Sequence, residues 1–222
     1  AYGTETVRPV DVIVGPGNVY VAIAKREVAG LVGVPSSFPG PSEVVVIADG
    51  TAPAELAAVD VILQAEHGPG GLAWLISWDE AALDAISAEI EAQVAVAPRR
   101  EDITSTFAEG GYAVLCDSPE QAVAVSNTIA PEHLELITAD PEALVPLVRH
   151  AGAVFCGPWS PASVGDYLAG PSHVLPTDGT ARFGSALTVS DFVKDVHVIT
   201  LDREALDRAA PTVAAIARAE GL

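Results

Sequence analysis

Short apolar runs alternate with longer amphipathic stretches along the chain. The runs are rich in Val and Ile and are bounded by Gly, Pro, Asp or Ser, which is typical of buried strands in a parallel sheet. They lie at 12–14, 44–47, 72–76, 113–115, 153–155 and 196–199. Because helical stretches separate them, the pattern predicts an α/β fold, a Rossmann-like layered structure with a mostly parallel sheet and helices on both faces.

Helical periodicity predicts six helices between and after these runs, at about 18–29, 53–66, 79–97, 118–129, 141–149 and 203–219. Thr51 is the expected cap of the second helix. Ser118 is the expected cap of the fourth, with Pro119 at the first helical position and Gln121 where a capping box places it. Segment 169–188 has little periodicity, and a loop of that length in a compact domain usually carries function.

Charge and composition exclude several classes of protein and of binding partner. The 222 residues include 11 Lys+Arg and 30 Asp+Glu, and the net charge of −19 argues against nucleic-acid or anionic-membrane binding. Half of the residues are hydrophobic, which excludes intrinsic disorder, yet no apolar run reaches the roughly 18 residues of a membrane helix. Cys116 and Cys156 are expected to be reduced thiols in a cytoplasmic protein, with a single disulfide left open.

Gly15-Pro16-Gly17-Asn18 stands between an expected strand and an expected helix. Glycines at such a turn allow close approach to an anion, and the start of a helix offers free N–H groups. The spacing is not that of a dinucleotide fingerprint, because Tyr20 occupies the third glycine position. The alternative is an ordinary turn in which Asn18 caps the helix.

Gln64 and His67 lie three residues apart at the end of an expected helix, so both project from one face. A histidine nitrogen is a common metal ligand, and a glutamine oxygen is an uncommon one. The alternative is a polar helix terminus at which Gly68 ends the helix.

Ala130-Pro131-Glu132-His133 places an acid beside a histidine. Histidine is the natural general base near neutral pH, and a desolvated glutamate activates water. Neighbouring residues on a strand point to opposite faces, so a turn is needed to aim both side chains at one site. The alternative is a helix that begins at Pro131, with Glu132 near its positive end.

Three further polar residues lie in irregular segments. Ser42 precedes the second expected strand and is either a substrate contact or a turn serine. Asp166 is either a carboxylate ligand or a cap. His173 lies in the long aperiodic loop and has no assigned partner.

Taken in order, these segments resemble the histidinol dehydrogenase family. The resemblance runs along nearly the whole chain, and no other family that we know has these blocks in this order. The matching blocks are 12–20, 40–44, 64–67, 130–134, 157–161, 165–167 and 170–177, the last with Gly179-Thr-Ala-Arg182.

The resemblance implies an oxidoreductase of histidine biosynthesis that converts L-histidinol to L-histidine in two NAD-linked steps through an aldehyde. It implies that Glu132 and His133 are the catalytic acid–base pair. It further implies that Ser42 and His133 contact the substrate and that Asn18 contacts NAD.

The resemblance also implies a zinc ion. Gln64, His67 and Asp166 match its ligands, and with the metal they would bind the substrate's imidazole and amine. Neutral oxygen, imidazole and carboxylate donors leave room for such nitrogen ligands.

Two parts of the family have no counterpart in this sequence. The family has an N-terminal half that forms much of the cofactor cleft. It also has a C-terminal tail that delivers a further Glu and the fourth zinc ligand, a His, to the partner subunit. We therefore expect a fragment of a homodimeric enzyme, with little or no activity alone.

The expected domains are 1–43, the end of an NAD-binding domain; 44–187, an α/β domain with the zinc and catalytic residues; and 188–222, the start of a tail. Two alternatives stay open. One is a relative that oxidises another small polyol or sulfonated alcohol. The other is a non-catalytic fragment that dimerises and binds zinc.

Overall fold

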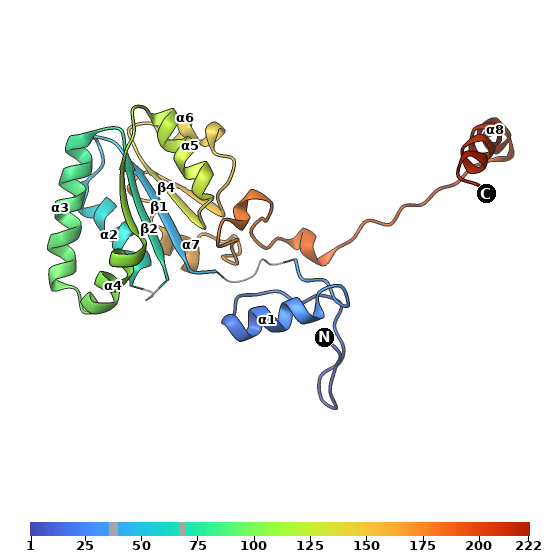
Figure 1. Ribbon diagram of the computed structural model, residues 1–222, viewed down its shortest axis with the longest axis horizontal. Coiled ribbons are helices and arrows are strands. Elements are labelled where there is room, and N and C mark those ends of the chain that lie inside the picture. The colour runs from blue at the N-terminus through green and yellow to red at the C-terminus, as the bar shows by residue number, and fades with distance from the viewer. Residues whose placement is uncertain (36–39, 67–69) are drawn as a thin grey trace. The chain divides into compact units, whose positions relative to one another are not determined.

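The computed structural model describes residues 1–35, 40–66 and 70–222 (Figure 1). The chain divides into two compact units, Ala1–Asp191 and Phe192–Leu222. The first unit contains the sheet and every candidate site residue that the structure describes. The second contains an extended segment followed by one amphipathic helix.

A five-stranded, wholly parallel sheet forms the centre of the first unit, with strand order β3-β2-β1-β4-β5. Its strands are β1 (Glu43–Ala48), β2 (Leu72–Ser77), β3 (Gly111–Leu115), β4 (His133–Ile137) and β5 (Ala153–Cys156). β1 and β4 are neighbours although 84 residues separate Ala48 from His133 along the chain. The strand order therefore places two distant segments side by side.

Helices cover both faces of this sheet, as the sequence predicts. α2, α3 and α4 pack on one face, and α5 and α6 pack on the other (Figure 1). The helices are α1 (Val19–Val28), α2 (Ala54–Ala65), α3 (Glu80–Val96), α4 (Arg100–Gly110), α5 (Pro119–Ile129), α6 (Pro141–Leu144), α7 (Ala162–Tyr167) and α8 (Arg203–Ala219), with 3-10 turns η1 (Val145–Leu147), η2 (Thr180–Arg182) and η3 (Val189–Phe192). The α/β prediction is confirmed.

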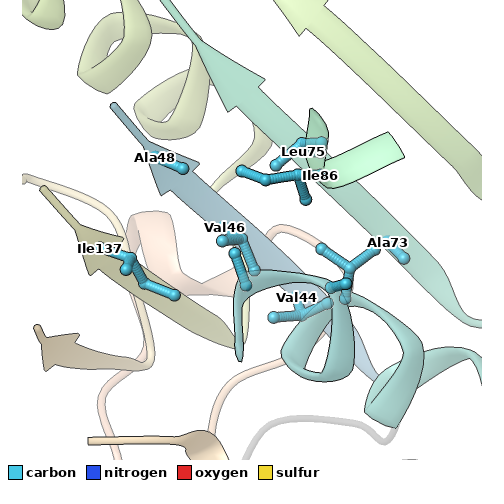
Figure 2. Close-up of a cluster of buried hydrophobic side chains, with 10 residues drawn as sticks. Val44, Val46, Ala48, Ala73, Leu75, Ile86 and Ile137 are labelled. Atoms are coloured by element: carbon cyan, nitrogen blue, oxygen red, sulfur yellow. The ribbon is translucent and has the colours of Figure 1, made fainter. Parts of the chain in front are cut away.

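Every residue of β1 is buried, because the strand lies between two helical layers. Its side chains alternate between two apolar clusters, as the twofold period of a strand requires. Figure 2 shows the cluster on the α2 face, with Val44, Val46 and Ala48 lined up along β1 between Leu75 and Ile137. This core fixes the positions of the strand ends on which the candidate site is built.

The strands depart from the sequence prediction in three places. Segments 12–14 and 196–199 are not strands: Val12 makes only an isolated bridge to Gly33, and 196–199 is exposed and irregular. β4 was not predicted, because its buried His133 and Glu135 interrupt the apolar pattern.

The helices agree more closely with the sequence prediction, but the helix predicted at 141–149 is too long. α6 ends at Leu144, since Pro146 has no N–H to donate to the carbonyl four residues back. α4 and the short α7 were not predicted.

Ser118 caps α5 as expected and accepts the N–H of Gln121 at 3.2 Å. Thr51 does not cap α2: its N–H and hydroxyl both donate to Asp49, and Pro53 occupies the cap position. Within the described part of the chain, no helix is long and apolar enough to cross a membrane.

Candidate active site

The candidate residues gather at the amino end of the sheet. Ser42 directly precedes β1, and Glu132 and His133 stand at the start of β4, with His133 opposite Val44. α2 returns from the carboxyl end of β1 to the start of β2, so Gln64 near its C-terminus reaches this same edge. Ligands of open parallel sheets usually bind at the carboxyl edge, so strand order alone would not locate this site.

A sharp turn aims the acid–histidine pair. α5 ends at Ile129, and Ala130 adopts the left-handed conformation (φ 57°) before Pro131 leads into β4. The alternative prediction of a helix beginning at Pro131 is wrong. Gly152 packs closely beneath this turn, because a Cβ there would lie 2.6 Å from the carbonyl oxygen of Glu132.

The backbone of Glu43 holds both members of the pair. Its N–H donates to Glu132 Oε2 at 3.3 Å, and its carbonyl oxygen lies 3.1 Å from Nδ1 of His133. Because a carbonyl oxygen only accepts, Nδ1 of His133 carries the hydrogen. The neutral imidazole then has its lone pair on Nε2, the nitrogen that can accept a proton.

Glu132 is poised to exchange a proton near neutral pH. Burial raises the pKa of its carboxyl to about 7. The charges of Glu43 and Asp166 act in the same direction, whereas hydrogen bonds from the Glu43 N–H and the Ser42 hydroxyl oppose the rise. Ser42 is thereby a direct partner of the candidate acid, in addition to its predicted contact with substrate.

Glu43 itself is a second buried acid that the sequence did not single out. Burial raises its pKa to about 7, and its carboxylate accepts the backbone N–H of Glu132, so the two glutamates bind one another reciprocally. Further N–H groups, from Asp178 and Gly179, bind it as well. Its only sequence signal was its position directly after Ser42.

His173 links the acid–histidine pair to Asp166. Its Nε2 lies 2.7 Å from Nε2 of His133 and 3.0 Å from Oδ1 of Asp166. With Nδ1 of His133 as donor, the Nε2–H of His173 is shared between these two acceptors. Gly165 on α7 makes room for the ring, since a Cβ there would lie 2.9 Å from Cε1 of His173.

The structure describes two of the three predicted zinc ligands. Gln64 is buried and Asp166 is exposed on α7, while His67 lies outside the described residues. Among the described residues, no group of three or more His, Cys, Asp and Glu is arranged to hold a metal ion. The donor types are nevertheless compatible with zinc, because imidazole and carboxylate are common zinc ligands, although an amide oxygen is an uncommon one.

The glycine turn joins the same site. Gly15 and Gly17 line a pocket of about 200 Å³ together with Ser42, Glu132 and His173. Asn18 caps α1, accepting the N–H groups of Tyr20 and Val21 at 3.1 and 3.2 Å, as the alternative interpretation of this turn expects. The buried Lys25 secures the turn by donating to the carbonyl oxygen of Gly15.

Comparison with known proteins decides the family. The sequence profile described as "Histidinol dehydrogenase" matches residues 1–222. The chain belongs to the histidinol dehydrogenase family. Histidinol dehydrogenases of Parasynechococcus marenigrum (strain WH8102) and Bacillus subtilis (strain 168) are each 49% identical to it, over 100% of this chain and 51% and 52% of their own lengths. The crystal structure of histidinol dehydrogenase from Elizabethkingia anophelis matches with a TM-score of 0.93 and 36% identity, over 100% of this chain and 51% of that one.

The family resemblance drawn from the motifs is thus confirmed. The chain spans about half the length of these histidinol dehydrogenases. Ser42, Gln64, Glu132, His133, Asp166 and His173 all lie in that half, and His173 joins Asp166 to His133 at the sheet edge.

Proposed function

We propose that this chain carries the acid–base and metal-binding residues of an enzyme that oxidises L-histidinol to L-histidine with NAD. The observation that carries the proposal is the connected set Glu132, His133, His173 and Asp166 at one edge of the sheet, in a chain of the histidinol dehydrogenase family. Histidinol dehydrogenation is the last step of histidine biosynthesis and passes through the aldehyde, histidinal.

His133 is the base of the alcohol step in this proposal. Oxidation of the alcohol requires loss of the hydroxyl proton as hydride leaves for the nicotinamide. The Glu43 carbonyl fixes the His133 tautomer, so that Nε2 receives that proton. His173, within 2.7 Å of the same nitrogen, stands where the substrate hydroxyl would approach.

Glu132 serves the aldehyde step. A water must add to the aldehyde before the second hydride leaves, and a carboxylate with a pKa of about 7 is a competent base for that water. Its Oε2 lies 3.5 Å from Nδ1 of His133, so a charge gained by the imidazole is stabilised by the neighbouring carboxylate.

Zinc would be held by Gln64, His67 and Asp166. When bound, the ion would anchor the imidazole and amine of the substrate and so orient its carbinol carbon. Together with the histidine that the family's tail supplies, these donors would still leave positions for the substrate nitrogens, which favours histidinol over a polyol or a sulfonated alcohol.

NAD would approach the pocket beside Gly15 and Gly17, with Asn18 as a contact. The Asn18 side chain supports this role only in part, because its oxygen already caps α1, so its amide nitrogen is the group left to donate. We further propose that the complete protein is a homodimer with shared sites.

A zinc-dependent dehydrogenase assay tests the function. NADH formation from L-histidinol is measured for the 222-residue chain and for a chain of the length of its relatives, each with His133→Asn as the matched control. We expect robust, zinc-dependent turnover in the longer chain, loss of it in His133→Asn, and feeble turnover in the 222-residue chain. Unchanged turnover in His133→Asn would contradict the proposal.

A further inference from the structure

Two acidic side chains outside the acid–histidine pair are buried against one another. Asp60 on α2 is 5% exposed and Glu135 on β4 is 1% exposed, and their carboxyl groups form a hydrogen bond. A pair of carboxyl groups bonds in this way only when one of them holds a proton. Neither residue takes part in the chemistry proposed above.

Glu135 also reaches a third element. Its Oε1 accepts the N–H of Ala162, the first residue of α7, at 3.2 Å. Pro161 at the cap position of α7 forms no side-chain cap, so Glu135 supplies the acceptor that the first turn of this helix needs. Glu135 therefore connects α2, β4 and α7.

Each connected element carries a site residue at a fixed offset. Gln64 lies four residues after Asp60, one helical turn along α2. Asp166 lies four residues after Ala162 on α7. His133 lies two residues before Glu135, on the same face of β4.

We propose that Glu135, bonded to Asp60 and to the start of α7, is a positioning residue that sets Gln64 and Asp166 at the spacing the metal requires. The inference rests on the proposed function, since it depends on those two residues binding zinc. Glu135 would touch neither metal nor substrate.

Burial explains why this link persists at neutral pH. Desolvation raises the pKa of Glu135 far above its ordinary value, so its carboxyl keeps the proton that it donates to Asp60. An apolar residue at 135 would leave the Asp60 carboxyl without its donor and the Ala162 N–H without its acceptor.

Two variants separate this role from simple packing. Glu135→Gln keeps a donor for Asp60 and an acceptor for Ala162, whereas Glu135→Leu keeps the bulk and loses both bonds. Leu136→Ala is the matched control, because Leu136 is buried on the same strand but faces α5 on the other side of the sheet. Zinc affinity and the unfolding temperature of the metal-free chain are measured for all three and for the unsubstituted chain.

We expect zinc binding to weaken about tenfold in Glu135→Leu and to stay near its original value in Glu135→Gln and in Leu136→Ala, despite the lower stability of the latter. Equal zinc affinity in Glu135→Leu and the unsubstituted chain overturns the inference and leaves the proposed function intact. Absence of zinc binding both in the unsubstituted chain and in a chain of the length of its relatives overturns both.

An infrared measurement tests the link without metal. At pH 9 the unsubstituted chain should show the carbonyl stretch of a protonated carboxylic acid, and Glu135→Gln should lack it. This comparison uses the variant that keeps the bonds, so it holds even if Glu135→Leu fails to fold. A spectrum without that band in the unsubstituted chain contradicts the shared proton.

Discussion

Glu43 and Glu132 give the folded protein a specific dependence on pH. Burial raises the pKa of each from its ordinary 4.5 to about 7. A raised folded-state pKa adds stability that is fully present below pH 4.5 and is lost as pH rises through 7. These two groups therefore make the folded state less stable at pH 8 than at pH 4.5.

Glu132→Gln should reduce that loss. A shift of this size corresponds to a free energy on the order of 3 kcal/mol, because one pKa unit is worth about 1.4 kcal/mol. The measurement is the free energy of unfolding by urea between pH 4.5 and 8 for both proteins. A variant that loses as much stability over this range as the unsubstituted chain would show that Glu132 titrates normally.

Substitutions of Glu132 and His133 should affect the alcohol and aldehyde oxidation steps differently. Glu132→Gln should slow the oxidation of histidinal by about 10² to 10⁴, because a neutral amide cannot activate water, and should slow the oxidation of L-histidinol less. His133→Asn should slow both. Single-turnover NADH formation from each substrate, in a chain of the length of its relatives, measures this. Equal losses on both substrates in Glu132→Gln would contradict a role confined to the aldehyde step.

At the residue scale, motifs predicted some partners better than others. Glu132 and His133 stood out because an acid beside a histidine is unusual after a proline. Glu43 did not stand out and His173 was named without a partner, because their contacts come from the pairing of β1 with β4 and from a loop that returns across the site. Their partners are distant in sequence, so no local pattern marks them.

At the scale of elements, most helices were predicted from local periodicity, although α4 and α7 were missed and one of the two predicted caps was wrong. Ser118 provides a test: Ser118→Ala should cost about 1 kcal/mol of unfolding free energy, since the Gln121 N–H loses its acceptor. Thr51→Ala should cost less, about 0.5 kcal/mol, because Thr51 caps no helix and its hydroxyl makes only an exposed hydrogen bond to Asp49. Chemical denaturation measures both, and equal costs would contradict the observed capping.

Strand β4 was missed because the site uses it. A strand that buries a histidine and a glutamate does not look apolar, although all five of its residues are buried. The apolar runs at 12–14 and 196–199 looked like strands but make no sheet. Local hydrophobicity thus misjudged segments whose partners are set by the whole fold.

Gly152 tests the link between this strand and the site. In Gly152→Ala the new Cβ would meet the Glu132 carbonyl oxygen, a backbone atom that cannot rotate away. We expect the turnover of L-histidinol to fall about 10²-fold, as misplacement of a catalytic group does. Gly33→Ala is the control, because its nearest neighbours would be at an ordinary 3.5 Å. Similar activity in the two variants would contradict the role of this turn.

At the scale of the whole molecule, the sequence predicted the parallel sheet but not its order. Strand order depends on contacts between segments that are far apart, such as β1 and β4, and no local pattern records them. That order is what brings Ser42 beside Glu132 and His133. The strand order determines where the candidate site lies, whereas the sequence motifs identify most of its residues.

The chain covers about half of its relatives, yet the candidate site residues that the structure describes lie at one edge of its sheet. We therefore expect this chain to bind the metal, even where efficient turnover needs more of the protein. Substrate and metal should bind cooperatively, and each should raise the affinity for the other by the same factor.

Calorimetric titration of the metal-free chain with zinc, with and without L-histidinol, measures whether this chain holds the metal site. We expect that zinc binds, that L-histidinol strengthens the binding, and that Gln64→Ala weakens it. Zinc binding that is indifferent to both L-histidinol and Gln64→Ala, in this chain and in one of the length of its relatives, would contradict it.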